Sequence, residues 1–511
     1  MKEYVASIDV GTGGVRCVIY DREGRAAAQC YREMKTYYTP DGRAEQDPAQ
    51  ITSGAMEAIA GALASGAVSA DAILGISVDG AQTSFAPIDK DGKYLGNLIL
   101  WQDMRGIAMF PWMREKLAAA GLTEAELYRR TLKPVDMMLS GAKLLWLRAH
   151  EPELYARIDK LANPQAVVLM ALGAEECTVD PTDVGWWLGH NGATLEEDPE
   201  LIRAFDLNPE VYPALRAPGT LVGRVSREVA ERTGLRAGTP LFQGAVDQCC
   251  AALGAGNTGK PGIGTLCMGT VGLMMSYSEK PMPDPTGHYY VIPYPTGGFA
   301  SELVVPVAAS AFRWVRDMLF PTGTYDPETV YAGMDAEAAK TRIGADGVAF
   351  LPFLSGCVYP MADANMRGGF IGASLSTTRA DLIRAALEGI CYEMRQVFEA
   401  ADTHLNRLMV LGGGARSQLW CQMQADVYGC AVETVTEPEA TALGSAMIAA
   451  AGAGLYPSIP EAVEGMSHVA HRFEPDPARA EAYSEAYRAW LCCQKALTPE
   501  AFPALARMRK Q

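Results

Sequence analysis

The sequence has little that would mark a metal centre or a disulfide framework. Its six histidines are scattered, and neither an HExxH motif nor a Cys/His cluster with metal-ligand spacing occurs. The twelve cysteines spread from Cys17 to Cys493 without a CxxC pair, and the only close pairs are adjacent residues, which suit disulfide geometry poorly. The pattern predicts free thiols that pack as small hydrophobic residues in a reducing cytoplasm.

Long apolar segments are also missing. No run of 18 apolar residues occurs, and the first ten residues hold one short apolar strand but no signal-peptide hydrophobic stretch. We therefore expect a cytoplasmic protein without a membrane partner.

Positive charge is scarce. The 511 residues contain 44 Lys and Arg against 60 Asp and Glu, a formal net charge of −16. This balance argues against a nucleic-acid partner, because non-specific binding to a phosphate backbone needs a basic surface. With 49% hydrophobic and 20% charged residues the chain is not disordered. Its length favours two large domains, and a cleft between two lobes suits a small-molecule ligand.

A glycine-rich hairpin is predicted at the start of the chain. Strands over residues 4–10 and 15–20 flank Gly11-Thr12-Gly13-Gly14, so this is neither a P-loop nor a Rossmann fingerprint, both of which open a helix. The glycines let backbone N–H groups close on phosphate oxygens, and Thr12 adds a hydroxyl. Asp9 ends the first strand, where it can hold Mg²⁺ through water. The alternative is a plain tight hairpin.

A second hairpin, over residues 264–276, has Gly269-Thr270 at its tip. Two Gly-Thr hairpins half a chain apart indicate weak internal duplication, although such hairpins are also common by chance. We expect the second tip to face the first across the cleft, so that the two clamp a triphosphate and tighten on closure.

A strand over residues 408–411 runs into Gly412-Gly413-Gly414 and then into a helix. The glycines allow a flat base to approach the backbone, and a helix N-terminus favours an anion. The segment Glu439-Ala-Thr-Ala442-Leu-Gly444 has small residues that leave room for adenine and ribose.

Asp247 follows a predicted buried strand over residues 240–246 and precedes a small-residue helix that starts at Gln248. A carboxylate there can accept a hydroxyl proton in phosphoryl transfer. It can equally cap the helix, and position alone favours the cap.

Together these segments resemble the FGGY family of carbohydrate kinases. The resemblance implies an α/β, two-domain, actin-like (sugar kinase and heat-shock ATPase) ribonuclease-H-like fold with an interdomain cleft. It implies an N-terminal domain over 1–256 on the sugar side and a C-terminal domain over 257–511 on the nucleotide side, ending in a helical tail. The matching stretches are Ile8–Thr12 with Arg16, Leu100–Arg105, Gly244–Gln248, Gly269-Thr270, Gly412–Ser417 with Leu419-Trp420, and Glu439–Gly444.

The resemblance also implies residue roles. Asp247 becomes the catalytic base and Asp9 the magnesium-associated acid, with ATP and Mg²⁺ as cofactors. The implied nucleotide contacts are Asp9, Thr12, Gly13, Gly269, Thr270, Gly413, Gly414, Arg416 and Ala442. The implied substrate contacts are Gln82, Thr83, Trp101, Asp103, Asp247 and Gln248, with Arg105 in the same wall of the pocket.

The substrate is less well determined. Xylulokinases usually have Met-His where this chain has Gln82-Thr83, and glycerol and autoinducer kinases have Arg-Glu there. The stretch from Trp101 to Arg105 is xylulokinase-like, whereas the first hairpin is similar to autoinducer kinases. A small carbohydrate is expected, with a ketopentose such as D-xylulose as the leading candidate. Another pentulose, a polyol or a quorum-signal dione is the alternative.

A non-enzyme of the same fold, an actin-fold ATPase or regulator, is the other alternative. Neither a chaperone's long peptide-binding tail nor a regulator's DNA-binding helix pair is evident. Dimers are common in the family, so a homodimer is a candidate assembly.

Overall fold

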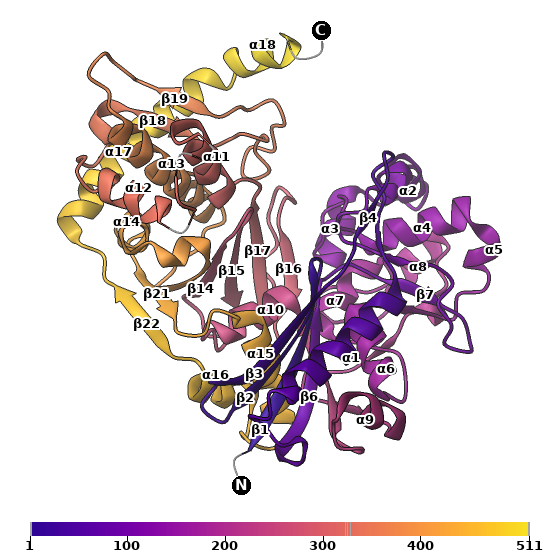
Figure 1. Cartoon of the computed structure of the whole chain (residues 1–511). Coiled ribbons are helices and arrows are strands. Elements are labelled where there is room, and N and C mark those ends of the chain that lie inside the picture. The colour runs from indigo at the N-terminus through magenta and orange to yellow at the C-terminus, as the bar shows by residue number, and fades with distance from the viewer. Residues whose placement is uncertain (1–2, 322, 324, 328, 509–511) are drawn as a thin grey trace. The chain divides into compact units, whose positions relative to one another are not determined.

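The computed structural model describes residues 3–321, 323, 325–327 and 329–508. The chain forms two compact units that are not contiguous in sequence (Figure 1). The first unit holds residues 1–259, 278–300 and 439–468, and the second holds 260–277, 301–438 and 469–511. The predicted boundary at 256/257 falls inside the first segment of the first unit and stays a prediction.

The first unit is built on a sheet with strand order β12-β13-β6-β1-β2-β3. Strands β1 (Tyr4–Gly11) and β2 (Gly14–Asp21) form the predicted antiparallel hairpin. Strands β6 (Ile73–Gly80) and β13 (Pro240–Val246) continue the sheet in parallel to β1. The sheet ends in β3 (Ala26–Glu33), which sequence reasoning missed because its residues are mostly exposed or half-buried.

Helices cover both faces of this sheet. The even-numbered side chains of β1 pack with α1 (Pro48–Ala64) and α6 (Pro164–Leu172) in one apolar core. The other face packs against α15 (Ala440–Gly452), where Ser445 Oγ lies 3.3 Å from Ser77 Oγ. Helix α15 also packs on α10 (Asp247–Gly254), and a Cβ added at Gly254 or Gly444 would lie 1.9 Å from the partner helix's backbone. The close contact between α10 and α15 therefore explains why small residues occur in segment 439–444.

A second apolar cluster in the first unit lies under the shorter helices. The remaining elements of this unit are β4 (Tyr37–Tyr38), β5 (Ala44–Gln46), β7 (Ala86–Ile88), β8 (Leu98–Ile99), α2 (Phe110–Ala119), α3 (Glu124–Thr131), α4 (Ser140–His150), α5 (Pro152–Tyr155), β9 (Lys160–Ala162), β10 (Thr178–Val179), α7 (Pro181–Val184), α8 (Pro199–Phe205), β11 (Ala214–Leu215), β12 (Leu221–Arg224), α9 (Arg227–Thr233), β16 (Tyr290–Pro293) and α16 (Ile459–Met466).

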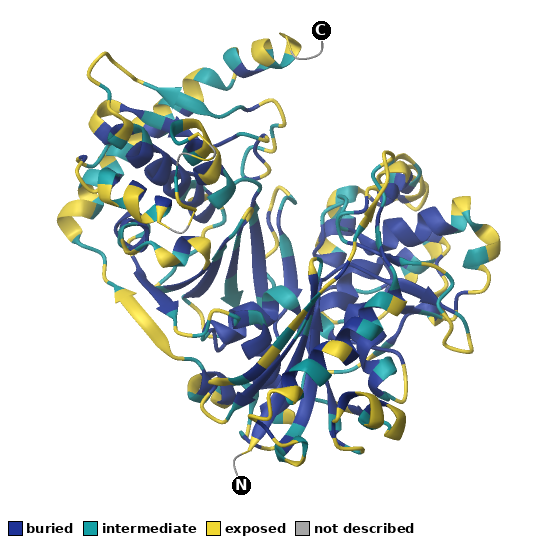
Figure 2. Cartoon of the chain, viewed as in Figure 1, coloured by how far each residue is buried: buried dark blue, intermediate teal, exposed yellow. Residues whose placement is uncertain are grey.

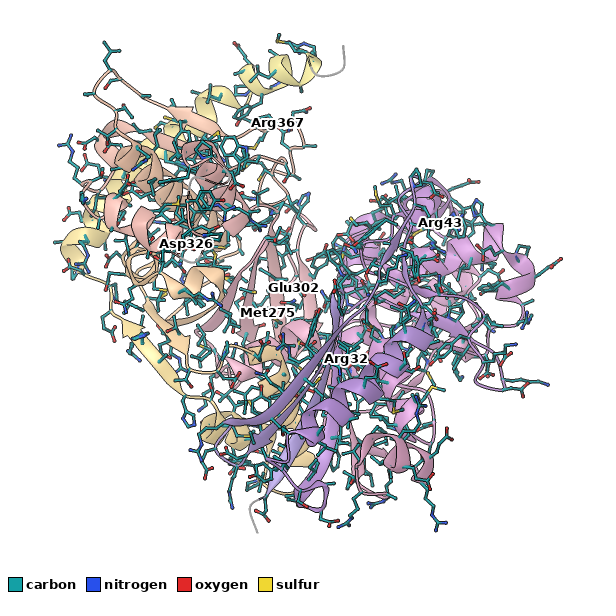
Figure 3. The ribbon with its side chains drawn as sticks, viewed as in Figure 1. Arg32, Arg43, Met275, Glu302, Asp326 and Arg367 are labelled. Carbon is teal, nitrogen blue, oxygen red and sulfur yellow. The ribbon has the colours of Figure 1, made fainter. Side chains whose placement is uncertain are left out.

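The second unit holds strands in the order β17-β15-β14-β20-β21-β22. The predicted second hairpin is β14 (Ile263–Met268) with β15 (Gly272–Ser278), and β14 runs parallel to β20 (Arg407–Gly412). Met275 on β15 and Glu302 on β17 (Phe299–Val305) are both buried in this unit (Figure 3). By contrast, β22 (Val469–Phe473) is mostly exposed (Figure 2).

A long helix of this unit is α13 (Arg379–Ala400), which begins with a capping box between Thr378 and Asp381. The others are α11 (Ala309–Leu319), α12 (Val330–Ala338), β18 (Ala349–Leu351), β19 (Gly369–Ile371), α14 (Gln418–Tyr428), β21 (Ala431–Val435), α17 (Pro477–Leu497) and α18 (Ala501–Met508).

All twelve cysteines are free thiols, as predicted. Over the described part of the chain, no helix has the length and apolar character needed to cross a membrane.

Candidate active site

Three aspartates follow or end three neighbouring parallel strands of the first unit. The β1–β6 register places Asp9 directly opposite Asp79, and the β6–β13 register pairs Gly80 with Val246, one residue before Asp247. The carboxyl ends of parallel strands are where α/β sheets bind ligands. Sequence reasoning assigned roles to Asp9 and Asp247 but missed Asp79. The signal was present, because Asp79-Gly80 ends its strand as Asp9 nearly ends β1.

Asp79 lies in an environment that opposes its ionisation. Its side chain is fully buried, and neither carboxyl oxygen has a protein donor in normal hydrogen-bond geometry among the described residues. Burial raises its pKa well above the ordinary value, and the negative charges of Asp9 and Asp247 raise it further. Burial also raises the pKa of Asp9, while its contact with Asp79 and the charge of Arg16 oppose that rise. A bound cation would stabilise the ionised forms of both acids.

Asp247 begins helix α10 and is half-buried. Its Oδ1 accepts a hydrogen bond from the N–H of Gln248 at 2.7 Å. The helix begins at Asp247 with Val246 as its N-cap and without a side-chain cap hydrogen bond, so the predicted capping role of Asp247 is wrong. The catalytic role stays a prediction.

The tip of the first hairpin is held by surrounding side chains. The Thr12 carbonyl accepts from Gln46 Nε2 at 2.7 Å, and the Gly13 carbonyl accepts from the Tyr31 hydroxyl at 2.8 Å. A Cβ at Gly14 would lie 2.4 Å from the carbonyl of Arg32, which is labelled on β3 in Figure 3, so glycine is required there. Thr12 and Gly13 are partly or fully exposed, which leaves them accessible to a phosphate.

The residues expected to contact substrate lie in the same unit as these acids. Trp101 Nε1 donates to Thr12 Oγ1 at 3.2 Å, which ties the tryptophan to the first hairpin. Gln82 and Thr83 are buried just after β6, and Thr83 has a φ of 59°. The Thr83 N–H donates to Asp183 Oδ1 at 2.9 Å. Asp183 was not singled out from the sequence, because it lies 100 residues away along the chain.

Asp103 is fully buried and bound by protein groups on both oxygens. Oδ2 accepts from the Ala44 N–H at 2.8 Å, and Oδ1 accepts from Arg105 Nε at 2.8 Å. These bonds show a structural role, joining β5 to the segment after β8. Its contact with substrate stays a prediction, as does that of Gln248.

Two loops of the second unit lie at one end of its sheet. The β14–β20 register pairs Met268 with Gly412, so the Gly269-Thr270 tip and the loop after Gly412 follow adjacent parallel strands. Thr270 is exposed, and its Oγ1 accepts from Arg313 Nη2 at 3.3 Å. Arg313, on α11, is a cation beside this tip that sequence reasoning missed.

Steric restrictions explain the first glycine of the loop that follows β20. Gly412 has a φ of 79°, and a Cβ there would lie 2.8 Å from the Met268 carbonyl, so only glycine fits. Nothing lies within 4 Å of a Cβ built on Gly413, and Arg416 is exposed, whereas Gly414 is buried against Met268. Gly413 and Arg416 are therefore open to a ligand. Ala442 is buried in α15 of the first unit, and its nucleotide contact stays a prediction.

Comparisons with known proteins agree with this arrangement. Residues 4–254 match the N-terminal domain, and residues 264–453 the C-terminal domain, of the FGGY family of carbohydrate kinases. The chain is 27% identical over 493 residues to a xylulose kinase of Staphylococcus epidermidis, covering 95% of each chain. It is 29% identical over 468 residues to a glycerol kinase of Gloeobacter violaceus, covering 90% of each.

Among solved structures, the xylulose kinase of Rhodospirillum rubrum superposes with a TM-score of 0.85 at 28% identity, covering 97% of this chain and 99% of the other. Both halves of the family and its two-domain sugar-kinase fold are thus present. The chain belongs to the FGGY family of carbohydrate kinases.

Proposed function

We propose that this kinase transfers the γ-phosphoryl group of ATP to a hydroxyl of a small carbohydrate, with a ketopentose such as D-xylulose as the leading acceptor. The observation that carries the proposal is the convergence of Asp9, Asp79 and Asp247 at the ends of three parallel strands. The acceptor-side segments around Gln82 and Trp101 belong to the same unit.

Asp247 acts as the general base. Its carboxylate follows β13, is half-buried, and takes the proton from the acceptor hydroxyl as the new P–O bond forms. The unbonded carboxyl oxygens of Asp79 and the raised pKa of Asp9 fit a nearby Mg²⁺. Magnesium, when bound, offsets the negative charge of the phosphates. Among the described residues no group of three acidic, histidine or cysteine side chains is arranged to hold a metal ion by itself.

We assign nucleotide contacts within each unit separately. Thr12 and Gly13 of the first unit and the Gly269-Thr270 tip of the second offer backbone N–H groups and hydroxyls to the phosphates. The open surface at Gly413 and the exposed Arg416 accommodate the adenosine end.

The choice of acceptor rests on several relatives named xylulose kinase at 24–28% identity. A glycerol kinase and a gluconokinase match at similar identity, and Gln82-Thr83 fits none of the expected acceptor pairs. A pentulose, a polyol or a sugar acid therefore all belong in the test.

The test is an ADP-release assay with D-xylulose, D-ribulose, glycerol and D-gluconate as separate acceptors. We expect acceptor-dependent ADP release with one of them, and a loss of about 10²- to 10⁴-fold in kcat for Asp247→Ala with nucleotide binding retained. Asp71→Asn, which changes an exposed acid of the same unit, serves as the control. ATP hydrolysis that no acceptor stimulates would instead support an actin-fold ATPase or regulator. Wild-type turnover by Asp247→Ala would remove the base assignment.

A further inference from the structure

A buried lysine of the first unit makes its hydrogen bonds with backbone carbonyls, while the charges of Asp103, Asp136 and Asp183 also act on it. Lys143 lies on α4 and is fully buried. Its Nζ donates to the carbonyls of Leu100 at 2.8 Å, Trp101 at 3.0 Å and Thr83 at 3.5 Å. Among the described residues it forms no ion pair within salt-bridge distance. An ammonium group has three donors, and these three carbonyls match that number.

The first of the two segments that Lys143 joins has a strained backbone. Thr83 is β-branched, and its φ of 59° lies in the left-handed region. Its N–H is held by Asp183, and its carbonyl also accepts from Ser140 Oγ at 3.0 Å, one turn before Lys143 on α4. Asp183 is held in turn by Asn163 Nδ2 at 3.2 Å. Strain of this kind persists only where the surroundings hold it.

The side chain of Thr83 is also informative. Its Oγ1 is buried and has no hydrogen-bond partner among the described residues. A buried hydroxyl without a partner is unfavourable, so such a group points to a ligand that completes it. The backbone clamp on Thr83 fixes where this hydroxyl lies.

The second segment carries the tryptophan. The Trp101 N–H donates to Ser84 Oγ at 3.0 Å, which is a direct bond between the two segments. Lys143 adds a second link through the carbonyls of Leu100 and Trp101 on one side and Thr83 on the other. The spacing between the Thr83 hydroxyl and the Trp101 ring is therefore held by the Ser84 bond together with one buried ammonium group.

We infer that Lys143 is a positioning residue that holds residues 82–84 and 100–101 at a fixed spacing and thereby sets the enzyme's selectivity among carbohydrate acceptors. The inference rests on the proposed function, in which these two segments contact the acceptor. Lys143 acts through their backbone and touches neither acceptor nor nucleotide.

The test compares Lys143→Met, which keeps the length of the side chain and removes all three donors, with the wild type. The substitution removes one donor from each of three buried carbonyls, of which Leu100 keeps the Asp103 N–H and Thr83 keeps Ser140 Oγ. The weaker hold should loosen both segments, so KM for D-xylulose, or for the best acceptor of the panel, should rise about tenfold. KM for ATP should change less than KM for the acceptor, since Lys143 reaches the first hairpin tip only indirectly, through Trp101 and Thr12, and the second-unit loops are untouched. The ratio of kcat/KM between the best and second-best acceptors should fall at least about fivefold.

The matched control is Lys133→Met. Lys133 is the other fully buried lysine of this region. Its Nζ donates to the Val291 carbonyl at 2.5 Å and lies 5.0 Å from the centroid of the Trp186 ring. We expect a comparable loss of thermal stability in this control but an unchanged acceptor ratio. An equal change of the ratio in both lysine variants, or an unchanged ratio in Lys143→Met, overturns the inference.

Ser140→Ala keeps the inference testable if Lys143→Met does not fold. It removes one donor from the Thr83 carbonyl and should raise KM for the acceptor about threefold with KM for ATP unchanged. No effect on either KM in a folded Ser140→Ala protein counts against the clamp. If the wild type phosphorylates no acceptor at all, the proposed function fails, which is a different outcome from failure of the lysine's role.

Discussion

Replacing Asp79 with asparagine should make the metal-free protein less sensitive to alkaline pH. Asparagine has nearly the shape of aspartic acid but cannot ionise. In the wild type the fully buried carboxyl group lies beside Asp9 and Asp247, and its pKa is raised well above 3.8, first by burial and then by these two charges. The folded protein therefore retains a proton that the unfolded chain releases.

The sign and size of the effect follow from proton linkage. Because the folded-state pKa of Asp79 lies above the unfolded value, its unfavourable contribution is absent below about pH 4 and grows as pH rises toward the folded pKa. One retained proton is worth at most about 1.4 kcal/mol per pH unit. Between pH 5 and pH 8 the wild type should therefore lose stability that Asp79→Asn keeps, with a slope no steeper than this limit, and its unfolding midpoint should fall relative to that of Asp79→Asn.

The assay is urea and thermal unfolding at pH 5, 6.5 and 8 in the presence of a chelator. Asp71→Asn, at an exposed position just before β6, is the matched control and should follow the wild type. Adding Mg²⁺ and ADP at pH 8 should stabilise the wild type more than Asp79→Asn. If Asp79→Asn and the wild type lose equal stability between pH 5 and pH 8, Asp79 is not the strained acid that its burial implies.

Three further predictions concern other sites. Burial raises the pKa of Glu393 to about 8. The stability of the wild type should therefore fall as pH rises from about 4.5 to 8. Urea unfolding of Glu393→Gln should show a loss that is smaller by up to about 1.4 kcal/mol per pH unit. Gly254→Ala should destabilise the first unit by about 1–3 kcal/mol or more, since its Cβ would lie 1.9 Å from the Ala440 carbonyl; an unchanged urea midpoint contradicts this contact. Thr270→Ala should raise KM for ATP about threefold through one lost hydroxyl contact and leave KM for the acceptor unchanged, and the opposite split would reassign the second hairpin tip.

Several elements were predictable because their signals are local. The hairpin of β1 and β2 follows from apolar strands around four consecutive small turn residues. The hairpin of β14 and β15 follows from apolar strands around the Gly269-Thr270 tip. Strand β22 was missed because it is almost wholly exposed and has no apolar alternation. Strand β3 was missed for a similar reason, as it forms an edge of its sheet.

The residues of the candidate site also fall into two groups, those with a local signal in the sequence and those that only the fold brings together. Asp9 and Asp247 could be selected because each stands at the end of an apolar strand in a recognisable motif. Asp79 also stands at the end of an apolar strand but in no such motif, and the parallel register is what shows that it lies opposite Asp9. The sequence led us to expect that Ala442 contacts the nucleotide, and this contact stays a prediction. In the structure Ala442 is buried in α15, and the close packing of α10 on α15 explains the small residues around it.

The sequence by itself determined the family, the glycine-rich turns and the acids at strand ends, since all of these depend on residues within a few positions of one another. Only the tertiary structure decided which distant groups meet. Asp183 holds a backbone N–H 100 residues away, and Lys143 gathers carbonyls 42 to 60 residues away. Such contacts carry no periodic signal in the chain, because strand register and helix packing bring their partners together, and local propensity does not encode either.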